Sequence, residues 1–190
     1  MLNYLVPAVF CSLALLSACE PKAHESLDPD EDKPITSTNP GTEKDDDPQL
    51  ETDSIIILAL AEVNAVRENG CNCGDQSMPS TSKLSWNTKL YEAASAHAKD
   101  MHANNYFSHT SKNGDNLYQR LAAADYITTH TDVITYGENI AFGNFDLKAA
   151  IQKWLASQSH CANLMRETYR EMAIAQSGNY WVQVFGAKRE

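Results

Sequence analysis

The apolar residues between positions 54 and 104 recur at the spacing of amphipathic helices. Over 54–69, Ile56, Leu60 and Val63 return at intervals of four and three residues, and a glycine follows as a stop signal. A second run, 87–104, repeats this spacing with a histidine among its apolar positions. The residues that share its face are Leu90, Ala94, His97 and Met101. We therefore predict one helix in each run.

Three shorter segments also favour helix. The first, 116–124, follows a Gly-Asp pair, and the second, 147–157, follows Asp146, a suitable N-cap. Trp154, in the predicted helix 147–157, is expected to face inward. Residues 160–165 are predicted to form a short helical turn.

Toward the C-terminus the pattern changes to that of strands. Residues 172–175 and 180–185 alternate or run apolar, and 176–179 between them has the composition of a turn. This predicts a β-hairpin, and 134–136 are expected to add a further strand. Helices before and between a few strands indicate an α+β fold.

Residues 1–18 have the features of an export signal. Leu5–Leu16 is mostly apolar but too short for an ordinary membrane span. It ends in Leu16-Ser17-Ala18-Cys19, which has the pattern of a bacterial lipobox. We predict cleavage before Cys19 and attachment of lipid to it. The alternative is a plain secretory signal with a coincidental cysteine, since no Lys or Arg precedes the apolar run.

A lipid on Cys19 would hold the mature protein on a membrane surface without a membrane span. The protein would then be extracytoplasmic and anchored in the cell envelope. The residue that follows Cys19 is Glu20 and not Asp. The absence of Asp at this position favours sorting of the lipoprotein to the outer membrane, if the organism has one.

The net charge of −10 is concentrated near the N-terminus. Residues 20–54 contain 12 acidic residues and 3 lysines, whereas 55–190 contain 13 acidic and 12 basic residues. Because 19–54 is also rich in proline and poor in aliphatic residues, we predict a disordered acidic tether there. The nearly neutral remainder lacks the basic face of a nucleic-acid-binding protein, so no nucleic-acid partner is expected.

One carboxylate and two imidazoles stand in distant parts of the domain: Glu138, His109 and His160. They could hold a divalent metal ion such as zinc, with water completing the coordination shell. They could also act as general acid and base, or hydrogen-bond one another and hold three loops together. Tyr180 adjoins the same set of segments and is a further candidate for ligand binding.

Several segments together resemble the bacterial branch of the CAP superfamily, which comprises cysteine-rich secretory, antigen 5 and pathogenesis-related proteins. The resemblance covers about 55–189. The segments that carry it are Leu84–Asn87, Asn105–Thr110, Tyr136–Ala141, Trp154–Ser157 and Tyr180–Gly186. It implies a CAP domain over 55–190, folded as a three-layer α–β–α sandwich.

The resemblance also implies a polar cleft. Family members line their cavity with two histidines and two acidic residues, and His109 and Glu138 match the first of each. Ser157 stands at the position of the second acid, and Tyr180 at that of the second histidine in eukaryotic members. The bacterial branch instead supplies His160 from the segment after the fourth helix.

Three cysteines lie in the domain, and an odd number leaves one thiol over. Bacterial relatives carry Cys-Gly and His-Cys pairs, which match Cys73-Gly74 and His160-Cys161. The resemblance therefore implies a Cys73–Cys161 disulfide that excludes Cys71. The alternatives are a Cys71–Cys161 bond or three thiols without a disulfide.

A catalytic interpretation lacks a nucleophile, because the sequence has neither G-x-S-x-G nor H-E-x-x-H. His97 is expected in the core and His102 at the surface. The leading hypothesis is an envelope-anchored domain that binds a divalent metal, lipid, glycan, protein or other envelope component. The alternative is a metal-dependent hydrolase, a protease or cell-wall enzyme, that uses the same His/Glu site.

Overall fold

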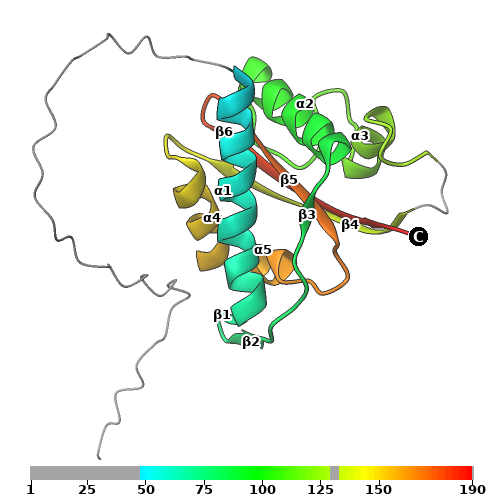
Figure 1. Ribbon diagram of the computed structural model, residues 1–190. Helices are drawn as coiled ribbons and strands as arrows, with labels where there is room; N and C mark the ends of the chain where they lie inside the picture. The colour runs from blue at the N-terminus through cyan, green and yellow to red at the C-terminus, as the bar shows by residue number, and fades with distance from the viewer. Residues whose placement is uncertain (1–47, 129–132, 190) are drawn as a thin grey trace, which may run out of the picture.

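The computed structural model describes residues 48–128 and 133–189, which form a sheet covered by helices on both faces (Figure 1). The signal segment, Cys19 and most of the tether, to residue 47, lie outside the described residues, as do His24 and His130. No helix in the described ranges has both the length and the apolar composition needed to cross a membrane.

The first two helices form close to where the sequence predicts them. Helix α1, Pro48–Asn69, begins six residues before the predicted start, within the segment assigned to the tether. Helix α2, Thr88–Asn104, begins after Asn87, whose side chain accepts hydrogen bonds from the second and third helical N–H groups. It ends at Asn105, which adopts the left-handed conformation that terminates many helices.

The shorter helices are α3, Leu117–Ala123, α4, Leu147–Ala156, and α5, Gln158–Leu164. Asn116 and Gln119 form a capping box at the start of α3, and Asp146 caps α4 as predicted. Local side-chain hydrogen bonds therefore define both starts.

The main sheet has four strands in the order β3-β5-β6-β4. Strands β5, Glu171–Ser177, and β6, Tyr180–Lys188, form the predicted antiparallel hairpin. Strand β4, Val133–Phe142, pairs antiparallel with β6 and is much longer than the predicted strand 134–136. Strand β3, Ser85–Trp86, runs parallel to β5, so the sheet is mixed.

Alternation along the strands divides the core between the two faces of the sheet. Met172, Ile174 and Phe185 pack with buried residues of α1, α4 and α5, whereas Ala173 and Val184 pack with those of α2 and α3. Burial of apolar side chains on both faces confirms the three-layer α–β–α arrangement.

A small hairpin lies beside α5. It consists of β1, Cys71–Cys73, and β2, Gln76–Met78, which are too short for the sequence pattern to reveal. The predicted disulfide joins Cys73 to Cys161 and ties this hairpin to α5, with 5.4 Å between the two Cα atoms. Cys71 remains outside this bond, as predicted.

Candidate functional site

The edge strand β4 carries the centre of the site. Successive side chains of a strand point to opposite faces, so Glu138 faces α3 and Asn139 faces α5. His109, from the loop after α2, places its Nδ1 atom 2.8 Å from Oε1 of Glu138. The Glu138 side chain is buried, whereas 58% of the His109 side chain is exposed. A buried carboxylate therefore orients an accessible imidazole.

Arg120 neutralises this buried carboxylate. Its Nη2 atom donates to Oε2 of Glu138 at 2.7 Å, and both side chains are less than a tenth exposed. Its Nη1 atom donates to the backbone oxygen of His109 at 3.0 Å. Sequence reasoning missed Arg120, although a charged residue next to the apolar Leu121 in a short helix was a usable signal. Arg120 thus fixes both partners of the imidazole–carboxylate pair.

His160 lines the same cleft from the opposite side of β4. The cleft has a volume of about 390 Å³, and its lining includes His109, Glu138, Asn139, His160 and Arg166. Burial lowers the pKa of His160, and the positive charge that His109 can carry lowers it further. A neutral imidazole has a lone pair that can bind a metal ion or accept a hydrogen bond.

Tyr180 is not part of this cleft. It pairs with Phe142 at the far end of β4, and the two ring centroids are 4.7 Å apart. Its ring also stacks on His102, which is exposed as predicted. Tyr180 therefore lies away from Glu138, because Phe142 is four positions along the extended strand from Glu138, with three residues between them.

A comparison with protein families assigns the fold and its cleft to a known group. The profile described as "CAP: Cysteine-rich secretory protein family" matches residues 60–185. The chain belongs to this family. The match includes the segments that carry His109, Glu138 and His160, so the polar cleft lies wholly within the CAP domain.

Curated relatives match part of this CAP domain. The uncharacterized membrane protein YlbC of Bacillus subtilis (strain 168) is 37% identical over 103 residues, which are 54% of this chain and 28% of YlbC. The uncharacterized protein YkwD of the same organism is 27% identical over 101 residues, 52% of this chain and 37% of YkwD. This chain therefore spans well under half the length of either relative.

Solved structures confirm the CAP fold. An extracellular protein containing an SCP domain from Bacillus anthracis str. Ames has a TM-score of 0.60 and 26% identity, over 80% of this chain and 45% of that chain. An outer surface protein from Borrelia burgdorferi has a TM-score of 0.57 and 20% identity, and the alignment covers 73% of this chain and 96% of that protein. At that identity the second likeness supports the fold alone.

The cleft of this CAP domain brings the three predicted residues, His109, Glu138 and His160, together in its lining. In the described ranges, His109, Glu138 and His160 are not among the side chains whose ligand atoms all lie within 4.8 Å of one another. Both carboxylate oxygens of Glu138 already accept hydrogen bonds, from His109 and Arg120. The donor set therefore suits a pair of imidazoles, with Glu138 as the group that orients one of them.

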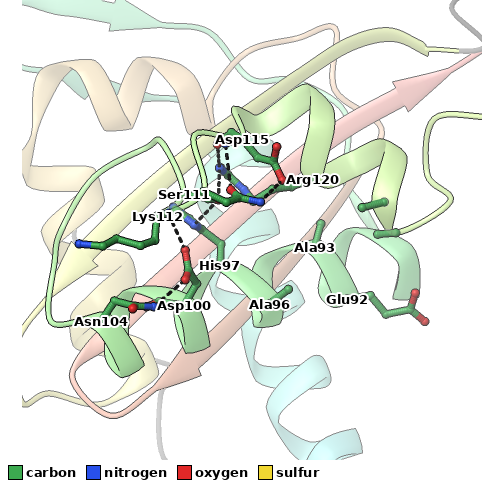
Figure 2. A pocket seen from close by; sticks show the side chains of 13 residues that line it. Glu92, Ala93, Ala96, His97, Asp100, Asn104, Ser111, Lys112, Asp115 and Arg120 are labelled. Carbon is green, nitrogen blue, oxygen red and sulfur yellow. Dashed lines mark hydrogen bonds between the residues drawn. The ribbon is translucent and has the colours of Figure 1, made fainter.

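A second hollow lies on the other side of Arg120, between α2, α3 and the loop 111–115 (Figure 2). It has a volume of about 550 Å³. At its base the fully buried His97 binds the backbone oxygen of Ser108 through Nε2 at 2.8 Å. The prediction that His97 belongs to the core is confirmed. Burial lowers its pKa, so the ring is neutral and helps hold the loop that carries His109.

Proposed function

We propose that this chain is an extracytoplasmic CAP-domain protein, anchored in the cell envelope by a lipid on Cys19, that binds a divalent metal ion such as zinc in the β4 cleft. His109 and His160 are the two ligands, and water molecules complete the coordination shell. Glu138 acts as the orienting partner of His109. The observation that carries this proposal is the 2.8 Å contact between Nδ1 of His109 and the buried carboxylate.

The hydrogen-bond roles follow from the chemistry of the pair. An ionised carboxylate can only accept, so Nδ1 of His109 carries the proton and Nε2 keeps the lone pair. Metal-binding histidines in proteins commonly have this carboxylate partner, which also raises their basicity. The ion pair with Arg120 keeps Glu138 directed at His109. The lone pair on Nε2 of His109 is therefore available to bind a metal ion.

Burial keeps the second imidazole, that of His160, in its neutral form. His160 lies in the same cleft, and its lowered pKa keeps it neutral at physiological pH. Asn139 and Asn163 hold the helix that carries it against β4. Binding of the ion would therefore need little rearrangement of the backbone.

The proposed location rests on the N-terminal sequence. Leu16-Ser17-Ala18-Cys19 has the lipobox pattern, and an acidic segment separates it from the domain. Relatives described as a membrane protein and as an extracellular protein are consistent with such a location. The cysteine would carry the lipid, and the domain would face the outside of that membrane.

Calorimetric titration of zinc into the mature chain, with its disulfide intact, tests the metal site. We expect one ion to bind at neutral pH, and we expect His109→Ala and His160→Ala each to abolish measurable binding. Glu138→Gln should weaken the affinity for zinc by about 10- to 100-fold, as is usual when the group that hydrogen-bonds to the second ring nitrogen of a metal-binding histidine is changed.

His102→Ala is the matched control, because His102 is an exposed histidine outside the cleft. It should bind zinc like the wild type. Absence of binding to the wild-type chain, or an equal loss in the control, would contradict the proposal. Zinc-dependent cleavage of a peptide or glycan by the same chain would replace it with the hydrolase alternative.

A further inference from the structure

A third sulfur atom lies beside the disulfide of this domain. Sγ of Cys71 is 3.6 Å from Sγ of Cys161 and 3.9 Å from Sγ of Cys73. Cys71 and Cys73 are two residues apart on β1, so both side chains point to the same face of the strand, toward α5. Cys161, on α5, completes a triangle of sulfur atoms. In the described parts of the chain, this is the group of three whose ligand atoms lie within 4.8 Å of one another.

The spacing of this triangle matches the ligand face of a zinc–thiolate site. Zinc binds thiolate sulfur at about 2.3 Å in tetrahedral geometry, which places neighbouring sulfurs about 3.8 Å apart. The two distances from Cys71 lie on either side of that value. The third pair, Cys73 and Cys161, is covalently bonded, so only this pair must separate for all three sulfurs to bind one ion.

We propose that reduction of the Cys73–Cys161 disulfide converts this cluster into a three-thiolate site for zinc or another soft divalent ion. A dithiol supplies two electrons and two protons: the S–S bond becomes two thiols, and the dithiol becomes its own disulfide. Binding of the ion then releases three protons, one from each cysteine, and forms three metal–sulfur bonds. A water molecule takes the fourth position.

The two states exclude each other. In the oxidised chain two of the three sulfurs are bonded to one another and offer no thiolate, so the cluster cannot hold the ion. In the reduced chain, metal–sulfur bonds to the ion would replace the disulfide as the connection between β1 and α5. Cys73 and Cys161 are fully buried and Cys71 is partly buried, which would shield the metal–sulfur bonds from water. The cluster is therefore a redox-dependent metal site, separate from the imidazole cleft.

Cobalt(II) titration of the full mature chain tests the proposal, because thiolate ligands give cobalt an intense near-ultraviolet charge-transfer band that imidazoles do not. The chain is reduced with a phosphine, which becomes the phosphine oxide with oxygen from water. We expect the band in the reduced chain, its displacement by zinc, and no band in the oxidised chain. Absence of the band in the reduced chain would overturn the proposal.

Two single variants separate this site from binding to a partly unfolded chain. Cys71→Ser keeps the disulfide, and after reduction it should lose about a third of the band intensity and at least tenfold in affinity. Cys161→Ser should lose as much band intensity and affinity, because it removes the one sulfur of the cluster that α5 supplies. A reduced Cys161→Ser chain that binds cobalt as tightly as the wild type would show that Cys71 and Cys73 act alone, and the proposal would fail.

The imidazole cleft is separated by a third variant. The double substitution of His109 and His160 by Ala should leave the charge-transfer band of the reduced chain unchanged. Loss of the band in that variant would show that the sulfurs need the cleft and would contradict an independent site. Circular dichroism of each reduced chain, with and without zinc, reports whether the ion restores the fold.

Discussion

The side chain of Asn139 donates a hydrogen bond to the backbone oxygen of His160 across 3.2 Å. Asn139 is fully buried on β4, and it also donates to Oε1 of Gln183 at 3.0 Å. Its own oxygen accepts from Asn163 of α5 at 2.9 Å. The strand that carries the carboxylate of the cleft is thus tied directly to the helix that carries the second imidazole.

Replacing Asn139 by Ala should therefore affect both stability and the cleft. It removes three hydrogen bonds, to the His160 carbonyl, Gln183 and Asn163, at a cost of about 2–3 kcal/mol. Urea unfolding measures the loss, and zinc titration should show weaker binding than in the wild type. Asn113→Ala, in an exposed loop, should change stability by no more than about 0.5 kcal/mol. Equal effects of the two substitutions would refute the structural role of Asn139.

Arg120→Met should destabilise the domain strongly. It removes the positive partner of a Glu138 side chain that is only 3% exposed, and loss of one partner of a buried ion pair costs about 3–5 kcal/mol. The measurement is a double-mutant cycle in urea with Glu138→Gln. Because the second substitution removes the buried charge, the double variant should recover much of the loss. Additive effects would show that the two side chains do not interact.

Stability should fall as the solution is acidified below neutral pH. Burial lowers the pKa of His97. Burial is also the main cause that lowers the pKa of His160, and the positive charge of His109 is a smaller one. The unfolded chain, with a histidine pKa of about 6.5, then binds protons more readily than the folded domain. The stabilisation is complete above that value and is lost as the pH falls below it. Urea unfolding across this range should show a smaller decline for His160→Gln, and an identical decline would count against the assignment.

Cys73→Ser should cost about 2–5 kcal/mol under oxidising conditions, since it removes a bond between residues 88 positions apart. Thermal unfolding of the variant and the wild type measures the difference. The matched control is Cys71→Ser, which leaves the disulfide in place and should unfold close to the wild-type temperature. If Cys73→Ser instead forms a Cys71–Cys161 bond, peptide mapping will reveal it and the loss will be smaller.

Cys19 should be the lipid-modified first residue of the mature protein. Mass spectrometry of the amino terminus should detect acyl chains on it, and Cys19→Ser should release the protein into the soluble fraction. The segment Leu16-Ser17-Ala18-Cys19 is the basis of this expectation. An unmodified mature terminus at another position would identify an ordinary secretory signal.

The sequence by itself determined the helices, the C-terminal hairpin and the cap at Asp146. These features depend on residues close together in the chain, because a helical repeat and an N-cap each involve only a few neighbours. Resemblance to the CAP family added the layered fold, the disulfide and the segments that hold His109, Glu138 and His160. No local pattern contains that information.

The tertiary structure alone decided which groups meet. The full length of β4, the ion pair of Arg120 with Glu138, and the exclusion of Tyr180 from the cleft all follow from strand pairing and helix packing. So does the triangle of sulfurs that brings Cys71 next to a disulfide. Such contacts join residues that are distant in the chain, and their geometry depends on burial of both sheet faces, which exists only after the three layers have packed together.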